Sequence, residues 1–329
     1  MRSHGPIRRA GLSLVWAGAL AAALAAAPVR AEYPERPVRI IVPYGAGGIA
    51  DLMLRQVAQK LSEKLGQQFI IDNRPGAAGI TAISAVVSSA PDGYTLAMIG
   101  GGLTTAKSLF KSLPYDLERD LIPISSTAYY SLVIATPAGT PYRTVADAIA
   151  AAKANPGKLN FGTISPGSNQ HLSGELFRAL AGIDITMIPY KTTPAVVTAL
   201  IRGEVDLAFD YQAGFEGALS DNKIVPLATT GSTRSPSLPG VPTAAESGLP
   251  GYEVTSWNGI AAPAGTPPEI VALLNREVNE ALRLPDVQAA TAKLGMEARG
   301  STVEELRERI ADDVVKWAKV IEAAGIPKK

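Results

Sequence analysis

The sequence contains no cysteine among its 329 residues and only two histidines, His4 and His171. Disulfide bonds therefore cannot stabilise the fold, and a lipid anchor attached to a cysteine is excluded. A chain of this length can bury enough apolar surface to be stable without disulfides. Since only one histidine and no thiol lie beyond residue 32, a zinc site is not expected, and we predict neither a metal nor a cofactor.

The chain also has little net charge, with 31 basic and 30 acidic residues. Loss of residues 1–31 would remove four arginines and no acid, leaving 27 basic and 30 acidic residues, a net charge of about −3. No basic patch with interleaved aromatic side chains is visible. Nucleic acid is therefore not an expected partner.

Only one long apolar stretch is present, at residues 10–27, and Arg2, Arg8 and Arg9 precede it. Residues 29–31 end in a small-x-small pattern that is typical of a cleavage site. We predict that residues 1–31 are an export signal peptide, cleaved after Ala31, and that the mature chain is periplasmic. Retention of the stretch as a membrane anchor is the alternative, but it is short and rich in alanine.

A glycine-rich segment at residues 43–51 follows an apolar run at 38–42 and precedes a segment with apolar residues at helical spacing. This order predicts a strand at 38–42, a flexible turn and a helix at about 49–65. The first N–H groups of such a helix have no partner within it, and glycines let the backbone approach a bound group. Because residues 43–51 include no cation, a carboxylate here would be held by backbone dipoles and water. An ordinary tight turn explains the same residues equally well.

The chain that follows alternates strand and helix patterns with short loops. Two further glycine-rich loops, at 73–79 and 100–105, follow predicted strands at 68–71 and 94–99. This alternation predicts right-handed crossovers and a parallel sheet, with the loops at the carboxyl ends of the strands converging on one edge. We expect these loops to face one cleft.

A second α/β unit follows, with a strand predicted at 131–136 and a helix predicted at 144–154, for which Thr144 is the expected N-cap. Its loop at 164–171 repeats the design of the loop at 43–51. It too lies between an apolar run and a helical pattern, and Ser165, Ser168 and Asn169 add side-chain donors. Two such loops on two domains could hold one ligand between them.

A weak internal repeat indicates how the two units are connected. Residues 133–141 resemble residues 259–267, and each segment precedes a predicted helix. We interpret the segments as outgoing and returning crossings, with a discontinuous first domain at 32–133 and 256–329 and a second domain at 134–255. Chance similarity among loops rich in alanine, proline, glycine and threonine is the alternative.

Several short motifs are spread over nearly the whole mature chain. They lie at residues 43–48 with Asp51, and at 73–79, 91–96, 189–191, 203–206, 241–243, 257–259 and 262–267. In this order and number they resemble the substrate-binding proteins of the tripartite tricarboxylate transporter family, also called Bug-type receptors.

The resemblance implies an α/β fold of the periplasmic binding-protein type, a type II Venus flytrap with two domains, two crossing connections and a ligand cleft between the domains. It implies a receptor that captures a small carboxylate and delivers it to a two-component membrane permease. The carboxylate classes are di- and tricarboxylates, aromatic carboxylates and amino acids. Loops 43–51 and 163–171 would hold the carboxylate, largely through backbone N–H groups and water. We expect a monomer that is not an enzyme.

The sequence departs from the family pattern at three positions. The family commonly has phenylalanine and proline where Tyr44 and Ala46 stand, and glycine where Thr192 stands. The Tyr44 hydroxyl would add a donor to the cleft, and Thr192 would narrow it. Both changes leave the carboxylate class in place and alter which carboxylate fits.

The predicted ligand-binding residues belong to both units. They are Tyr44, Gly45, Ala46, Gly47, Gly48, Asp51, Gly101, Thr104, Thr163, Ser165, Gly167, Ser168, Asn169, His171, Tyr190 and Asp210.

Each side chain with notable chemistry in this region also has a structural interpretation. Asp51 in the first helical turn is favoured by the macrodipole, and that role is preferred over ligand contact. Asp210 could receive a ligand amino group or cap a turn, and Tyr190 could line the cleft or pack in the core. His171 could contact the ligand or cap its helix. Arg74 is expected at the surface or against a neighbouring acid rather than on the ligand.

Two alternative functions are compatible with the residues. One is a periplasmic hydrolase that depends on His171, but no G-x-S-x-G nucleophile elbow is present. The other is a sensor that binds the same ligand and signals through a membrane partner, which the sequence does not distinguish from a transport receptor.

Overall fold

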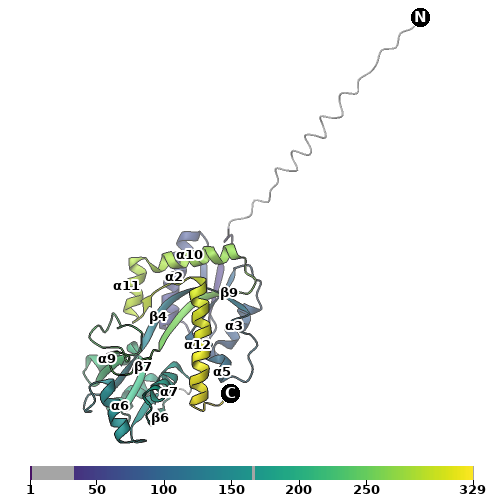
Figure 1. Ribbon diagram of the computed structural model, residues 1–329. Coiled ribbons are helices and arrows are strands. Elements are labelled where there is room, and N and C mark those ends of the chain that lie inside the picture. The colour runs from purple at the N-terminus through teal and green to yellow at the C-terminus, as the bar shows by residue number, and fades with distance from the viewer. Residues whose placement is uncertain (2–32, 165–166, 329) are drawn as a thin grey trace. The chain divides into compact units, whose positions relative to one another are not determined.

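A mixed sheet of ten strands runs through the described part of the chain, which comprises Met1 and residues 33–164 and 167–328 of the computed structural model (Figure 1). Met1–Glu35 and Arg36–Lys329 form two separate compact units, and the sheet belongs to the second. The predicted signal peptide, except Met1, lies outside the described residues. No helix in the described ranges is long and apolar enough to cross a membrane.

The first half of the sheet contains three parallel strands, β1 (Val38–Val42), β2 (Phe69–Asn73) and β3 (Thr95–Gly100), in the order β2-β1-β3. Strand β9 (Thr255–Pro263) lies antiparallel to β3, and β4 (Leu121–Pro137) lies antiparallel to β9. The predicted parallel strands are present, but the sheet as a whole is mixed because β9 runs against them.

The second half repeats this arrangement. Strands β5 (Asn160–Thr163), β6 (Thr186–Pro189) and β7 (Leu207–Tyr211) are parallel, in the order β7-β5-β6, and β4 lies antiparallel to β7. Strand β8 (Ile224–Thr229) also pairs with β4, and the short β10 (Glu297–Ala298) pairs with β4 in the first half. Each half therefore has three parallel strands followed by one antiparallel strand.

Strand β4 belongs to both halves. Residues 121–131 pair with β9, and residues 132–137 pair with β7 and β8. The strand was predicted to begin at Ser131, which is wrong by ten residues. Its earlier part contains buried Ser125 and Ser126, which interrupt the apolar pattern and are satisfied by hydrogen bonds to residues 299–301.

The internal repeat corresponds to a repeated turn. The Thr140 Oγ1 hydroxyl donates to the carbonyl oxygen of Pro137 at 2.9 Å, and the Thr266 Oγ1 hydroxyl donates to that of Pro263 at 2.8 Å. Both turns end the antiparallel strand of their half. The pairing partners of β4 change between Ser131 and Leu132, and β9 begins at Thr255, so the crossings precede the repeated segments. The domain boundaries at 133/134 and 255/256 remain a prediction.

Helices cover both faces of the sheet (Figure 1). They are α2 (Ile49–Leu65), α3 (Ile80–Val87), α4 (Gly101–Thr104), α5 (Ala106–Leu109), α6 (Val145–Ala154), α7 (Asn169–Ala181), α8 (Thr193–Ile201), α9 (Gln212–Ser220), α10 (Pro268–Leu282), α11 (Pro285–Lys293) and α12 (Val303–Ala323), with a 3₁₀ turn at Ala77–Gly79. The predicted cap of α6 is confirmed, because Thr144 accepts from the Asp147 N–H group.

Helix α12 contacts both halves of the molecule, as its course in Figure 1 shows. Leu306 and Ile310 near its start belong to the core of the first half, whereas Trp317, Val320 and Ile321 near its end pack with the core of the second half. The two halves are therefore joined by this helix as well as by the strands.

Candidate functional site

The loop between β1 and α2 places the start of α2 at the carboxyl end of the parallel strands. Gly47 has a φ of 82°, which favours glycine, and its N–H donates to Asp51 Oδ2 at 2.9 Å. Gly48 is the extended N-cap residue, and its carbonyl oxygen accepts from the Leu52 N–H at 2.9 Å. The N–H groups that follow Gly48 have no partner within the helix and point out of its end.

The loop before α7 has the same backbone design. Gly167 has a φ of 84°, and its N–H donates to His171 Nδ1 at 2.9 Å. Ser168 is the extended N-cap residue, and its carbonyl oxygen accepts from the Leu172 N–H at 2.9 Å. The predicted repetition of the loop is therefore present for these residues. Ser165, a predicted site residue, lies outside the described residues.

Asp51 stabilises the first loop through hydrogen bonds. It is 1% exposed, and Asn73 Nδ2 donates to Oδ1 at 2.8 Å while Arg55 Nε and the Gly47 N–H donate to Oδ2. Burial acts to raise the pKa of Asp51, but the hydrogen bonds from Arg55, Gly47 and Asn73 outweigh it and lower this pKa. Because both carboxylate oxygens are engaged, Asp51 positions the loop, and its assignment as a ligand-contacting residue is not supported.

His171 has the matching role in the second loop. Its Nδ1 accepts the Gly167 N–H, so the imidazole proton is on Nε2, which lies 3.5 Å from Glu175 Oε1. The side chain is buried, and Arg178 donates to the other oxygen of Glu175 at 2.7 Å. With both nitrogens directed at protein groups, His171 has no free nitrogen to act as a general base on a substrate.

Cations near the first loop are committed to carboxylates. Arg74 donates to Asp72 Oδ2 at 2.8 Å, as the sequence led us to expect, and Arg55 pairs with Asp51 at 2.9 Å. Neither guanidinium group is therefore unpaired and able to bind an anion at the start of α2.

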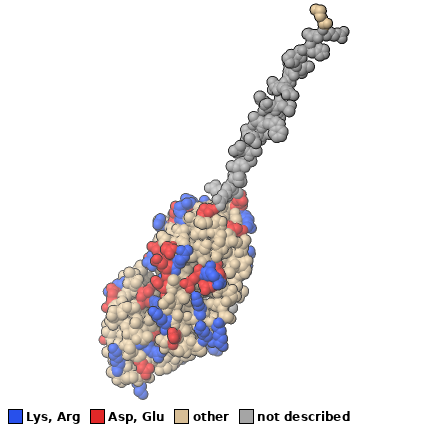
Figure 2. All heavy atoms as spheres, turned by 45° about the vertical axis from the view of Figure 1, so that its right-hand side comes forward, with Lys and Arg blue, Asp and Glu red and all other residues tan. Residues whose placement is uncertain are grey.

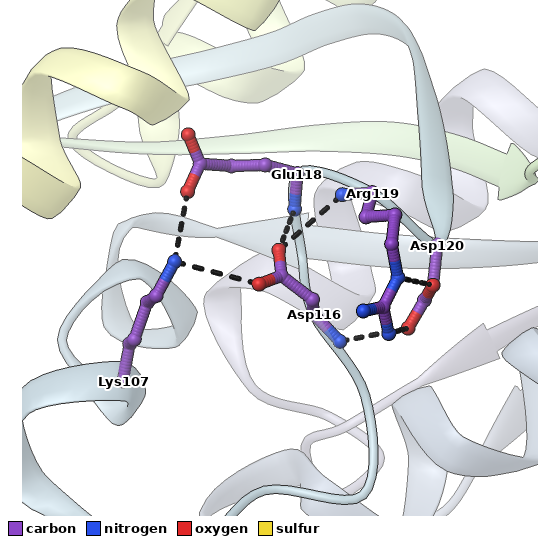
Figure 3. A network of polar contacts seen from close by, with 5 residues as sticks. All are labelled: Lys107, Asp116, Glu118, Arg119 and Asp120. Carbon is purple, nitrogen blue, oxygen red and sulfur yellow. Dashed lines mark hydrogen bonds and ion pairs between the residues drawn. The ribbon is translucent and has the colours of Figure 1, made fainter.

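Lys107, the cationic side chain that follows the third loop, is also paired with carboxylates in a polar network. Lys107 on α5 lies between Asp116 and Glu118, with Nζ 3.4 Å from an oxygen of each (Figure 3). Arg119 and the Asp116 N–H group donate to Asp120 and lower its pKa to about 2. The network ties the segment between α5 and β4 together.

The third loop, predicted at residues 100–105, contains the short helix α4. Gly101 is buried, and Thr104 Oγ1 donates to the Gly101 carbonyl oxygen at 2.7 Å. The Thr104 hydroxyl is therefore used within the turn. Gly102 is exposed and lies beside the Tyr44 hydroxyl, 3.8 Å from the position that a Cβ would occupy.

A cluster of polar side chains connects the two loops, and we call it the polar floor. Its members are Tyr44, Tyr130, Asn169, Tyr211, Ser256 and Asn258.

In the second-half part of the polar floor, Asn169 joins α7 to the start of β9. Its Nδ2 donates to the Tyr211 hydroxyl at 3.1 Å and to Ser256 Oγ at 3.0 Å. The hydroxyl groups of Tyr211 and Ser256 are also hydrogen-bonded to each other at 3.0 Å. A residue of the second loop is thereby bonded directly to the returning crossing strand.

In the first-half part, the Tyr130 hydroxyl donates to Asn258 Oδ1 at 3.3 Å, and the Tyr130 and Tyr211 ring centroids are 5.2 Å apart. A Cβ placed on Gly100 would lie 3.0 Å from Asn258 Oδ1 and 3.6 Å from the Tyr44 hydroxyl. The Tyr44 hydroxyl and Asn258 Oδ1 thus both lie close to Gly100 at the end of β3.

The three tyrosines of the floor are neutral near pH 7. Burial, with a smaller contribution from Tyr211, raises the pKa of Tyr44 to about 12. Burial also raises the pKa of Tyr130 well above its usual value and raises that of Tyr211. Tyr44 as a whole is 38% exposed, so its hydroxyl end is directed inward while another part of the residue faces solvent.

Sequence reasoning identified Tyr44 and Asn169 of this floor but missed the other four members. Asn258 and Ser256 lie at or beside a motif used for the family resemblance, and Tyr211 directly follows Asp210. What these four residues share is a place on β4, β7 or β9 next to a crossing, which only the sheet topology reveals.

Asp210, in contrast, has no free oxygen. Gln170 Nε2 and the Tyr211 N–H donate to Oδ1 at 3.0 and 2.8 Å, and Thr193 Oγ1 donates to Oδ2 at 2.7 Å. Asp210 ties α7 and α8 to β7, so the predicted contact with a ligand amino group is not supported.

The last two predicted residues lie at the edge of the β5–β6 pair. Tyr190 packs against a hydrophobic cluster beside Gly162, and its N–H donates to the Thr163 carbonyl oxygen at 2.8 Å. Thr163 is fully buried, and its Oγ1 has no hydrogen-bond partner among the described residues.

A cavity of about 190 Å³ lies elsewhere, beside the crossing strands, and contains no residue of the two loops. Its arginines are engaged, because Arg234 pairs with Glu246 at 3.0 Å and Arg299 lies 3.9 Å from the centre of the Tyr129 ring. The face of the molecule in Figure 2 likewise mixes both signs of charge.

Two half-sheets joined by crossing strands, each with a glycine-rich helix start at the carboxyl end of its own parallel strands, define a periplasmic binding-protein fold. Two solved structures share it. The R. palustris protein Rpa4515 with adipate is 35% identical with a TM-score of 0.74, and the match covers 91% of this chain and 100% of that one. MatC from Rhodopseudomonas palustris with bound malate is 31% identical with a TM-score of 0.70, covering 88% of this chain and 100% of MatC.

The family follows from the sequence comparisons. The profile described as tripartite tricarboxylate transporter family receptor matches residues 53–326. Protein BugT of Bordetella pertussis is 37% identical over 313 residues, covering 94% of this chain and 96% of BugT. The chain belongs to the tripartite tricarboxylate transporter receptor family, and the predicted family and fold are confirmed.

Proposed function

We propose that this protein is a periplasmic receptor that captures a small carboxylate between its two halves and delivers it, as a monomer, to the membrane permease of a tripartite tricarboxylate-type transporter. The carrying observation is the pair of matching loops before α2 and α7, each with a left-handed glycine and an extended cap residue. Helix starts of this length attract anions through free N–H groups and the helix dipole.

The ligand carboxylate is proposed to lie between the N–H groups at the start of α2 and those at the start of α7. The contacting residues of the first loop are Tyr44, Gly45, Ala46, Gly47 and Gly48. Those of the second loop are Gly167, Ser168 and Asn169. Ser165, which lies outside the described residues, is also proposed to contact the ligand. Asp51 and His171 hold these loops in shape.

The structural neighbours support a carboxylate ligand, since Rpa4515 was solved with adipate and MatC with malate. Both molecules are dicarboxylates. The N–H groups of the two helix starts would bind a carboxylate at one end of the ligand. The polar floor between them would contact the rest of the ligand.

Calorimetric titration of the mature protein tests this proposal. Adipate, malate, citrate, benzoate and glutamate are compared with adipamide and a neutral sugar. We expect at least one carboxylate to bind and its neutral counterpart to bind far more weakly. Tight binding of the sugar or a metal ion, with no carboxylate bound, would overturn the proposal.

A matched pair of glycine variants locates the site. Gly47→Ala and Gly66→Ala place alanine at φ values of 82° and 71°, and a Cβ at either position meets no atom within 4 Å. Both should lose about 1 kcal/mol of stability through backbone strain. Only Gly47→Ala should also weaken carboxylate binding, by about fivefold or more, because Gly66 lies at the far end of α2.

A further inference from the structure

Asn258 contains a buried donor that nothing in the described chain satisfies. The residue is 1% exposed, and its Oδ1 accepts from the Tyr130 hydroxyl at 3.3 Å. Its Nδ2 atom has no hydrogen-bond partner. Leaving a buried amide N–H₂ group unpaired is costly, and an unsatisfied group of this kind in a native structure calls for an acceptor from outside the chain.

The Tyr44 hydroxyl is the group of the first loop that lies near the Asn258 side chain. It lies 3.6 Å from a Cβ position on Gly100, and Asn258 Oδ1 lies 3.0 Å from that position. No hydrogen bond of the Tyr44 hydroxyl is present within the described residues. Tyr44 and Gly102 are both exposed as residues, so the Tyr44 side of this cluster borders solvent.

The place between Tyr44 and Asn258 offers hydrogen bonds without charge. None of the six side chains of the polar floor is ionised near pH 7, and each oxygen of the Asp51 and Asp210 carboxylates already accepts a hydrogen bond from the protein. An ionised oxygen would lose its hydration here and gain no counter-charge, whereas an uncharged oxygen needs only a donor.

We propose that Tyr44 and Asn258 form a subsite for an uncharged oxygen on the ligand chain, so that this receptor prefers hydroxy- or oxo-substituted carboxylates to the plain saturated ones. The inference rests on the proposed function, because the ligand carboxylate is taken to lie at the two helix starts. The Asn258 amide donates to the hydroxyl or keto oxygen, and the Tyr44 hydroxyl donates to it or accepts from it.

Matched ligand pairs test the preference by calorimetry on the mature protein. Malate is compared with succinate, and 2-oxoglutarate and 2-hydroxyglutarate are compared with glutarate. The oxygenated member of at least one pair should bind about tenfold more tightly, since its partner leaves the buried amide unpaired. Equal or tighter binding of the plain member in every pair would overturn the inference.

Two variants assign the preference to these residues. Tyr44→Phe removes one hydroxyl, and Asn258→Leu removes the amide at similar volume. Either should reduce the tenfold preference to about threefold or less, because the ratio of the two affinities is compared within each variant. Tyr142→Phe, a hydroxyl deletion outside the floor, is the control and should keep the preference. Thermal unfolding checks that each variant folds, and Tyr44→Phe carries the test if Asn258→Leu does not.

The outcomes separate this inference from the proposed function. If carboxylates bind but neither variant changes the preference, the subsite is wrong and the receptor function stands. If no carboxylate binds to the unaltered protein, the proposed function fails and this inference fails with it.

Discussion

In each of the two loops, one buried side chain accepts the N–H of a left-handed glycine. Asp51 does this for Gly47, and His171 does it for Gly167, both at 2.9 Å. A carboxylate and a neutral imidazole thus perform the same local task, because each presents an acceptor one helical turn beyond the glycine. The resulting loop shape leaves the following N–H groups free for an anion.

Replacement of Asp51 by alanine should loosen the first loop. Three donors, from Gly47, Arg55 and Asn73, would lose their acceptor, and we expect a loss of about 1–3 kcal/mol in the free energy of unfolding. Carboxylate affinity should fall with it. Asp51→Asn keeps one oxygen and should lose less. Urea denaturation and calorimetry measure both effects, and an Asp51→Ala protein with unchanged affinity would contradict the supporting role.

Replacement of His171 by alanine should have a similar effect on the second loop. Gly167 would lose its acceptor, and carboxylate affinity should fall about fivefold or more because the loop is less ordered.

The unaltered protein should show binding without turnover when ligand is recovered and analysed after incubation. Hydrolysis of an ester by the unaltered protein that His171→Ala abolishes would instead establish the enzymatic alternative.

For single residues, the sequence predicted where loops and caps lie better than it predicted which groups the side chains contact. Glycine content and order predicted where the loops lie, and Thr144 was correctly predicted as a cap. The spacing of Asp51 and His171 gave no sign that both side chains turn back onto their own loops. Asn258 was missed because its role depends on β3 and β4, which are distant in sequence.

Among the elements, α12 also binds the returning crossing strand β9. Arg309 donates to the Thr255 carbonyl oxygen at 2.8 Å, and Asp313 accepts from Trp257 Nε1 at 2.7 Å. Burial raises the pKa of Asp313 although Arg309 and Trp257 act to lower it. The start of β9, which carries Ser256 and Asn258, is thereby fixed from outside the sheet.

The cap of α12 should therefore matter to stability. Thr302 Oγ1 accepts from the Glu305 N–H at 3.1 Å, and Glu305 Oε2 accepts from the Thr302 N–H at 2.8 Å. Thr302→Ala should lower the free energy of unfolding by about 1 kcal/mol, whereas Thr302→Ser should be nearly neutral. Urea denaturation of the two variants checks this, and equal losses would show that the hydroxyl is not responsible.

Element boundaries were predicted well where the apolar period was unbroken, as in β1 and α2. Strand β4 was the main failure, because buried Ser125 and Ser126 imitate a polar loop. Their hydrogen bonds run to residues 299–301, far along the chain. Local pattern cannot show that a buried polar residue has a distant partner.

For the whole molecule, the pairing of carboxylates with cationic side chains and N–H groups predicts how the free energy of unfolding changes at low pH. The pKa of Asp120 is lowered to about 2, and the pKa values of Asp51 and Asp116 are also lowered. A carboxylate whose pKa is lower in the folded state stabilises the protein above its unfolded pKa of about 4. This contribution is lost as the pH falls through the folded value.

The free energy of unfolding should therefore decline between about pH 4 and pH 2. Urea denaturation at pH 7, 4 and 3 measures the decline, and Asp120→Asn should make it shallower. A protein that becomes more stable over this range would contradict the assignment of these ion pairs. The raised pKa of Asp313 acts in the opposite direction, because its protonation relieves a buried charge.

The order of strands and helices was enough to predict an α/β fold in two similar halves. What the sequence could not supply is the mixed direction of the strands and the way α12 spans both halves, since these depend on packing between distant segments. The floor between the loops is built at this level, from β4, β7, β9 and α7 together.

The most direct test is a crystal structure of the mature protein with a carboxylate found by the titrations. It should place the carboxylate oxygens within hydrogen-bond distance of N–H groups at the starts of both α2 and α7, with no lysine or arginine side chain in contact. A ligand bound away from these helix starts, or held there by a lysine or arginine, would contradict the account.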